Sequence, residues 1–232
     1  MGQAALALPA KASAPLRRVH DVAPHSLAER VALVRSPCFW PALPGKRPLS
    51  QIERAGLIRL ADSIPGACGD EKMVALMEAM RHAPAGDVVE IGSGCGRTAA
   101  LLVWLARRYE IGAVLCLDAW NDETLADFEI DLAPLAEGRL NYLNADAAAD
   151  YAPDFAVKTQ TFGETRYAGR LAMLHMGADD TPLETWAAHV APGGWLVFEG
   201  CAEAGAAFAE ANQPRICASF TAGEAFFVQL KR

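Results

Sequence analysis

A glycine-rich segment in the first half of the chain has the residue types of a ligand-binding turn. The apolar run at 87–91 carries Glu90 near its end, glycines follow at every second position from Gly92 to Gly96, and an Ala/Leu-rich helix is expected over 98–109. Glycine lets the backbone turn sharply and approach a ligand without a Cβ in the way. The start of the helix offers free N–H groups and a positive dipole end. The segment therefore predicts a cradle for an adenosine-type ligand at the tip of a parallel strand.

Two nucleotide fingerprints compete for this loop. The dinucleotide pattern G-x-G-x-x-G fails when it is counted from Gly92, because Arg97 stands where the third glycine belongs. Counted from Gly94, a G-x-G-x-x-A match ends at Ala99, but short glycine patterns arise often by chance. The fuller pattern E-x-G-x-G-x-G, which begins at Glu90, is more selective. The alternative is a glycine-rich turn that binds nothing.

Polar and aromatic residues after the next two strands could complete a nucleoside site. Asp118 ends the strand expected at 114–117. A carboxylate that binds ribose is expected roughly twenty residues after the glycine loop, and Asp118 follows Gly92 by a little more than that. Its alternative role is a helix cap. Trp120 could pack beside an adenine or belong to the core. Asp146, after the strand expected at 139–143, could accept a hydrogen bond from the adenine amino group or cap the next turn.

His175 and three carboxylates near the ends of later strands are candidates for chemistry. His175 lies at the tip of the strand expected at 171–176, and the pKa of histidine suits a general base near neutral pH. A hydrogen-bonded core histidine is the alternative, and Asp179 is a second candidate base. Asp179, Asp180 and Glu199 could supply three oxygen ligands to a hard cation such as Mg²⁺. Alternatively, the two aspartates only stabilise the start of the next helix.

The elements that must position these residues alternate between strand and helix. This order predicts an α/β fold with a doubly wound, mostly parallel sheet, because parallel neighbours need helical crossovers. The last two strands are joined by Thr-Ala-Gly at 221–223, which is a hairpin signal. Helices are expected at 50–62, 71–82, 98–109, 122–135, 182–189 and 201–211, and strands at 87–91, 114–117, 139–143, 171–176, 195–198, 215–220 and 224–230.

Length and composition bound the class of protein. The 232 residues are enough for one α/β domain, expected at 50–232, with an N-terminal arm or extension at 1–49. The hydrophobic fraction of 52% allows a large core. The net charge of −7 and the lack of a basic cluster argue against nucleic acid as a partner.

Apolar runs and cysteines indicate the compartment. No apolar run approaches about 18 residues, so no membrane span is expected, and no basic segment precedes the mildly apolar N-terminus as in a signal peptide. The six cysteines contain no C-x-x-C pair, which predicts free thiols in a reducing compartment. We therefore expect a cytoplasmic protein.

From about Ile52 onward the chain resembles class I S-adenosylmethionine-dependent methyltransferases, in particular the macrocin O-methyltransferase-like and cephalosporin-hydroxylase-like group. The resemblance rests on V-V-E-I-G-S at 88–93 with G-R-T at 96–98, V-L-C-L-D-A-W at 114–120, L-H-M at 174–176 and P-G-G-W-L-V-F at 192–198. It implies a Rossmann-like methyltransferase fold. That fold has a seven-stranded sheet, a C-terminal antiparallel hairpin and an N-terminal helical extension over the cofactor pocket.

The resemblance also implies roles for individual residues. The glycine loop would wrap the methionine part of S-adenosylmethionine, with the acid of the motif close to its charged end. The implied cofactor contacts are Glu90, Gly92, Ser93, Gly94, Gly96, Thr98, Asp118, Ala119, Trp120, Asp146 and His175. Relatives usually carry Asp-Gly-(Asn/Asp)-His after the fourth strand, whereas Gly177 stands first here, before Asp179 and Asp180. This departure leaves metal dependence and acceptor chemistry open.

The sequence thus predicts a small-molecule methyltransferase, with O-methylation of a sugar-like or natural-product hydroxyl as the expected reaction. The alternatives are a cofactor-binding homologue with lost or altered catalysis and an NAD-dependent oxidoreductase. The expected partner is a small-molecule methyl acceptor, with neither nucleic acid nor membrane. Phe39 and Trp40 in the proline-interrupted N-terminal loop suggest a homodimer.

Overall fold

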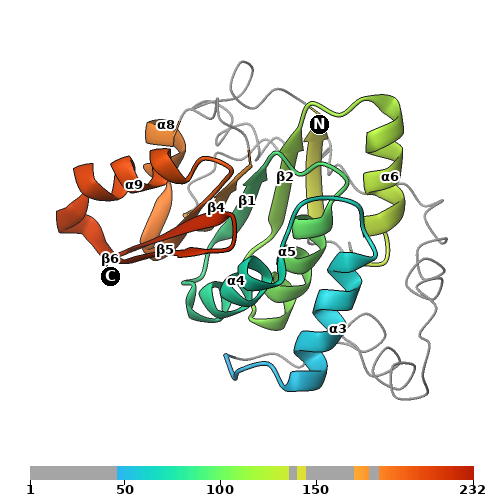
Figure 1. Cartoon of the computed structure of the whole chain (residues 1–232), viewed down its shortest axis with the longest axis horizontal. Helices are drawn as coiled ribbons and strands as arrows, with labels where there is room; N and C mark the ends of the chain where they lie inside the picture. Colours follow the sequence, from blue (N-terminus) through green and yellow to red (C-terminus); the bar gives the residue numbers. More distant parts are fainter. Residues whose placement is uncertain (1–45, 136–139, 145–169, 178–182) are drawn as a thin grey trace, which may run out of the picture.

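The computed structural model describes residues 46–135, 140–144, 170–177 and 183–232 (Figure 1). Three predicted site residues, Asp146, Asp179 and Asp180, lie outside these ranges, as do Phe39 and Trp40. The predicted division between an arm at 1–49 and a domain at 50–232 stays a prediction, because most of the arm also lies outside.

The described helices and strands follow the predicted alternation. The helices are α3 (Gln51–Asp62), α4 (Asp70–His82), α5 (Arg97–Arg108), α6 (Asp122–Leu132), α8 (Leu183–Ala187), α9 (Ala202–Ala211) and the short 3₁₀ helix η2 (Gln213–Arg215). The strands are β1 (Asp87–Ile91), β2 (Val114–Asp118), β3 (Leu140–Asn144), β4 (Leu171–Met176), β5 (Val190–Glu199), β6 (Ile216–Ala222) and β7 (Ala225–Leu230).

The strands form one seven-stranded sheet in the order β3-β2-β1-β4-β5-β7-β6. β1 to β5 run parallel, and β7 is antiparallel to both β5 and β6. The predicted doubly wound, mostly parallel sheet with a terminal hairpin is therefore confirmed. The strand order reverses between β1 and β4, and the crevice at the carboxyl ends of these two strands is where open α/β sheets bind ligands.

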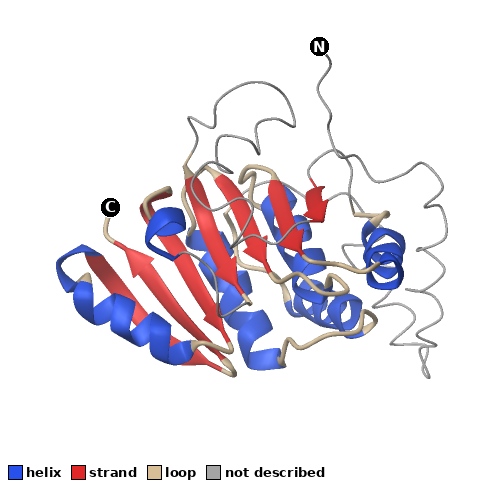
Figure 2. Ribbon diagram, turned by 90° about the horizontal axis from the view of Figure 1, so that it is seen from above, coloured by secondary structure: helices blue, strands red, loops and turns tan. Residues whose placement is uncertain are grey.

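Helices cover both faces of the sheet (Figure 2). Side chains alternate along each strand, so neighbouring residues contribute to different cores. Val88 of β1 packs with α3, α4 and α5, whereas Val89 packs with α8 and α9 on the other face. None of the described helices is long and apolar enough to cross a membrane. The five cysteines in the described ranges are free thiols.

The first part of β5 differs from the sequence prediction, which treats 191–194 as a turn. The strand begins at Val190 and runs through Pro192 and Gly193 to Glu199. Its pairing with β4 shifts register in this region, and Gly193 has a φ of 80°. A bulge tolerates proline and glycine where a regular ladder does not. The turn residues therefore mark a bulge inside the strand rather than its beginning.

Candidate functional site

The glycine loop between β1 and α5 has the backbone geometry of a ligand cradle. Gly92, Gly94 and Gly96 have φ values of 82°, 52° and 95°, in the left-handed region that favours glycine. A Cβ on Gly92 would lie 3.0 Å from the carbonyl carbon of Gly177, and one on Gly96 would lie 3.0 Å from the Phe128 ring. A Cβ on Gly94 would meet nothing within 4 Å. The outer glycines therefore allow close packing, and the middle one leaves space above the loop.

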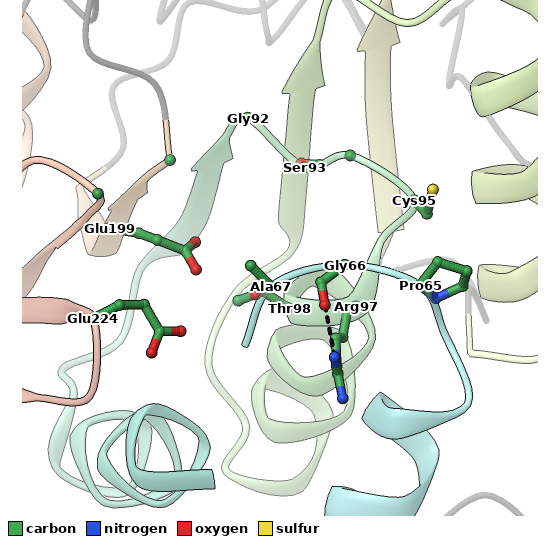
Figure 3. Close-up of a pocket in the computed structure, with 13 residues that line it drawn as sticks. Pro65, Gly66, Ala67, Gly92, Ser93, Cys95, Arg97, Thr98, Glu199 and Glu224 are labelled. Atoms are coloured by element: carbon green, nitrogen blue, oxygen red, sulfur yellow. Dashed lines mark hydrogen bonds between the residues drawn. The ribbon is translucent and has the colours of Figure 1, made fainter. Parts of the chain in front are cut away.

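That space opens into a cavity of about 340 Å³ at the carboxyl edge of the sheet (Figure 3). Three parts of the chain that are distant in sequence enclose it: the α3–α4 connection, the glycine loop with the start of α5, and the ends of β4, β5 and the β6–β7 turn. The lining residues are Pro65, Gly66, Ala67, Gly92, Ser93, Gly94, Cys95, Arg97, Thr98, Gly177, Glu199, Gly200 and Glu224.

Arg97, which breaks the dinucleotide pattern, binds the α3–α4 connection to the glycine loop. Its Nη1 donates to the carbonyl oxygen of Gly66 at 2.6 Å (Figure 3), and its Nη2 pairs with the carboxylate of Asp62. The guanidinium presents several donors in a fixed fork, so it can hold a carbonyl and a carboxylate together. The connection is thereby held over the start of α5, where it forms one wall of the cavity.

A row of polar side chains crosses the sheet beneath this wall. Glu90 of β1 pairs in register with Cys116 of β2 and with His175 of β4. Glu199 ends β5, the strand next to β4. It lies two residues after Val197, which pairs with His175. Strand alternation places all four on the face covered by α4 and α5. The carboxyl edge therefore carries polar groups on four adjacent strands, and all of them except Glu199 are fully buried.

Lys72 of α4 completes this cluster, although the sequence analysis did not single it out. Its side chain is fully buried, and its Nζ pairs with Glu199 Oε1 and donates to Thr98 Oγ1 at 3.3 Å. A signal for it exists: Lys72 precedes the buried Leu76 by four residues and so lies on the apolar face of the helix. A lysine there needs a buried anionic partner, and Glu199 provides it.

His175 lies between two carboxyl groups without a close hydrogen bond. Its Nδ1 is 3.7 Å from Glu90 Oε1, and its Nε2 is 3.6 Å from Glu199 Oε2. Both distances exceed those of a hydrogen bond. Burial lowers the pKa of His175 well below 6.5, and the charge of Lys72 adds to this effect. His175 is therefore neutral near pH 7.

Glu90 is also uncharged near neutral pH. Burial raises its pKa to about 8, although Ser93 and Lys72 act in the opposite direction. Cys116 Sγ donates to Glu90 Oε2 at 3.5 Å, and burial raises the pKa of this thiol well above 9.0. With Glu90 and His175 neutral, the Lys72–Glu199 pair is the charged part of the cluster.

The structure brings some of the predicted site residues to the cavity and leaves others behind it. Five of them line it: Gly92, Ser93, Gly94, Thr98 and Glu199. Glu90 and His175 are fully buried and do not line it, so Glu90 lies beneath the loop rather than at its ligand-facing surface. Gly96 packs against α6, and Ala119 is exposed.

Asp118 and Trp120 support the loop from the β2 side. Asp118 Oδ2 accepts a hydrogen bond from the N–H of Gly94 at 2.6 Å, and Trp120 Nε1 donates to the carbonyl oxygen of Gly94 at 2.5 Å. The Trp120 ring is buried in an aromatic cluster, with centroids 4.7 Å from Phe128 and 6.2 Å from Tyr142. The core role that the sequence leaves open for Trp120 is thus present, and the ribose role of Asp118 stays a prediction.

Glu224, in the β6–β7 turn, lines the cavity and is a second functional residue that the sequence did not indicate. Its Oε1 accepts a hydrogen bond from the N–H of Gly69 at 3.1 Å. Burial acts to raise the pKa of Glu224. Two kinds of interaction outweigh burial and lower this pKa below 4.5: hydrogen bonds from its own backbone and from Gly69, and the charges of Lys72 and Arg97. The carboxylate is ionised at neutral pH and faces the same space as Glu199 (Figure 3).

Of the three predicted metal ligands, only Glu199 lies in the part of the chain that the structure describes. Within the residues that the structure describes, no group of three or more His, Cys, Asp and Glu side chains is arranged to hold a metal ion. Glu199 is paired with Lys72, and Asp179 and Asp180 lie outside the described ranges. The magnesium site stays a prediction.

Neither a protein-family model nor a curated protein sequence matches the chain. Among solved structures, a methyltransferase from Geobacter sulfurreducens aligns with 80% of this chain and 93% of its own, at 16% identity and a TM-score of 0.51. The chain has the Rossmann-like methyltransferase fold. At this identity the likeness shows the fold alone.

Two further structures are similar at a lower level. An rRNA methylase from Streptococcus thermophilus has 13% identity and a TM-score of 0.49, over 72% of this chain and 100% of that chain. A precorrin-6y C5,15-methyltransferase from Geobacter metallireducens has 12% identity and a TM-score of 0.47, over 72% and 90%. These scores lie below 0.5, so we infer nothing about this chain from their substrates.

The methyltransferase fold also bears on the oxidoreductase alternative. Dinucleotide-binding domains have the strand order 3-2-1-4-5-6, whereas an antiparallel strand is inserted before the last strand here. Arg97 also stands in place of the third glycine of the dinucleotide pattern. The oxidoreductase alternative stays a prediction.

Proposed function

We propose that the protein is an S-adenosylmethionine-dependent methyltransferase that methylates a hydroxyl of a small molecule, sugar-like or of natural-product type. The observation that carries the proposal is the cavity of about 340 Å³ at the strand-order switch point, open above Gly94 and covered by the α3–α4 connection. Cavities of about 300–1,000 Å³ suit small organic ligands and cofactors.

The residues present fit this cofactor. S-adenosylmethionine, when bound, supplies a methyl group activated by a sulfonium, and it also carries an ammonium group. Glu199 and Glu224 direct two carboxylates into the cavity, whereas Arg97, the one cation among the described lining residues, is bound to Asp62 and Gly66. Carboxylates in a partly dehydrated site favour positive ligand charge.

In this proposal the chain contributes mainly alignment and exclusion of water, which are the largest tasks in a displacement of this kind. The glycine loop and the α3–α4 connection hold the cofactor. Glu199, held from beneath by Lys72, is the described carboxylate on the β4–β5 side and accepts the hydrogen bond of the acceptor hydroxyl. His175 does not reach the cavity, so we assign it a positioning role behind Glu199 instead of the role of general base.

Calorimetric titration with S-adenosylhomocysteine tests the cofactor assignment. Gly94→Ala is the probe variant, and Gly193→Ala is its control, because Gly193 also has a positive φ, of 80°, and lies in the β5 bulge outside the cavity. Both changes impose left-handed strain, but only the first puts a Cβ above the loop. We expect wild type and Gly193→Ala to bind equally and Gly94→Ala to bind at least about tenfold more weakly, or about 1.4 kcal/mol.

A turnover assay with S-adenosylmethionine and a panel of hydroxyl acceptors, with and without Mg²⁺, then separates the remaining alternatives. Formation of S-adenosylhomocysteine that depends on an acceptor supports the methyltransferase. Binding without turnover supports the homologue with lost catalysis. Failure of wild type to bind S-adenosylhomocysteine would overturn the proposed function.

A further inference from the structure

β6 closes the sheet at the end opposite β3 (Figure 1), and its outer edge has no partner among the described strands. Its seven residues, Ile-Cys-Ala-Ser-Phe-Thr-Ala at 216–222, include neither a charged residue nor proline. Proteins usually protect a sheet edge with charges, proline, bulges or a covering element, because its free N–H and C=O groups can pair with another chain. Here a bulge between Ile216 and Ala218 leaves 218–222 regular.

The exposed part of this strand is uncharged, and its outer edge pairs with none of the described strands. The side chains from Cys217 to Thr221 are all exposed. Phe220 is 40% exposed, although its inner side stacks on Phe227 with centroids 5.0 Å apart and an interplanar angle of 2°. A ring held flat by a buried neighbour is a rigid apolar contact, which loses little conformational entropy when a partner covers it.

The two ends of β6 carry opposite charges. Near its start, Arg215 is exposed beside Lys231, whose Nζ donates to the carbonyl oxygen of Pro214 at 2.8 Å. Near its end, the exposed Glu71 of α4 accepts a hydrogen bond from the N–H of Gly223 at 3.1 Å. The edge is therefore basic at one end and acidic at the other.

We propose that two copies of this chain pair antiparallel through β6, near Phe220, and join their sheets into one. A two-fold axis across the strand places the basic end of each copy opposite the acidic end of the other, whereas parallel pairing would place like charges together. The two exposed Phe220 rings would lie near the axis. This charge pattern favours a second copy over an unrelated partner, and the inference does not depend on the proposed function.

Sedimentation velocity on wild type, two charge variants and a mixture of these variants tests this pairing. Wild type should be a dimer whose dissociation constant rises with salt, because exposed charges are screened. Arg215→Glu alone and Glu71→Lys alone should each weaken the dimer by about a hundredfold, because each creates two like-charge contacts. An equimolar mixture of the two variants should dimerise again, since each altered residue then faces an opposite charge. Recovery in the mixture also shows that both variants fold.

A second pair of variants tests the edge itself. Phe220→Lys should abolish the dimer, and Ile130→Lys should not, because Ile130 is similarly exposed at 37% but lies on α6 at the other end of the sheet. A monomeric wild type would overturn the proposal. So would a dimer that tolerates Phe220→Lys, or a mixture of the charge variants that stays monomeric.

Discussion

Lys72 and Glu199 show how single residues fix the chemistry of the site. A fully buried ammonium group has a large desolvation cost, and Glu199 offsets it from the neighbouring strand end. The pair presents a carboxylate to the cavity at a fixed position. Sequence patterns indicate Glu199 only as a metal ligand, because Lys72 lies more than 120 residues earlier in the chain and gives no local signal of its partner.

The stability of variants tests this pairing. Glu199→Gln should destabilise the fold by about 3 kcal/mol, because Lys72 would remain buried without a carboxylate. Adding Lys72→Met to this variant should recover more than half of the loss, since no unpaired charge remains. Urea denaturation of Glu199→Gln, Lys72→Met and the double variant measures the coupling free energy between Lys72 and Glu199. Additive effects of the two substitutions would contradict the pairing.

Glu90 predicts a pH dependence of stability. Its pKa is about 8 in the folded state and about 4.3 in an unfolded chain, so the folded state holds an extra proton between these values. Stability from this group therefore falls as pH rises through that window, by at most about 1.4 kcal/mol per unit. Glu90→Gln removes the effect.

Thermal unfolding of wild type and Glu90→Gln from pH 5 to pH 9 measures it. The advantage of the glutamine variant should grow with pH and level off above about 8. The opposite contribution from His175, whose lowered pKa reduces stability as pH falls below 6.5, is present in both proteins and cancels. A difference that does not vary with pH would refute the buried protonated state of Glu90.

At the scale of elements, most of the fold follows from local sequence patterns. The glycine loop, the alternation of apolar residues and the Thr-Ala-Gly turn predict the strands, the crossover helices and the hairpin. The start of β5 is missed because proline and glycine indicate a turn unless tertiary pairing creates a bulge. The burial of Glu90 is missed because correct strand bounds alone do not say which face of the sheet its side chain takes.

The α3–α4 connection is the element whose role needs three dimensions. Arg97→Ala should release this connection and weaken the binding of S-adenosylhomocysteine by about tenfold. Folding stability should change by less than about 1 kcal/mol, because the Asp62 side chain is 46% exposed. Calorimetry and thermal unfolding measure the two quantities.

Asp62→Asn provides the matched control for Arg97. It removes the ion pair but leaves the hydrogen bond from Arg97 to the carbonyl oxygen of Gly66. We expect ligand affinity within about twofold of wild type, since exposed pairs contribute little. Equal losses in Asp62→Asn and Arg97→Ala would assign the effect to charge instead of the link to Gly66.

At the scale of the whole molecule, the cavity depends on segments that only the fold brings together. The α3–α4 connection and the β6–β7 turn are more than 150 residues apart, and they meet where Gly69 donates to Glu224 and Gly223 donates to Glu71. The sheet order places this turn beside the glycine loop because β7 is inserted next to β5. No sequence window contains both walls, so the acidic side of the cavity could not be predicted from the sequence.

A ligand in this cavity should therefore protect distant segments together. With saturating S-adenosylhomocysteine, amide hydrogen exchange should slow at 65–69, at 92–98 and at 223–224, because the same bound molecule contacts all three walls. α9, which packs on the opposite face of the sheet, should exchange at an unchanged rate. NAD at the same concentration should protect none of these amides. Slower exchange at 92–98 alone would mean that the ligand rests on the glycine loop without the walls around it, and the enclosed site described here would then be wrong.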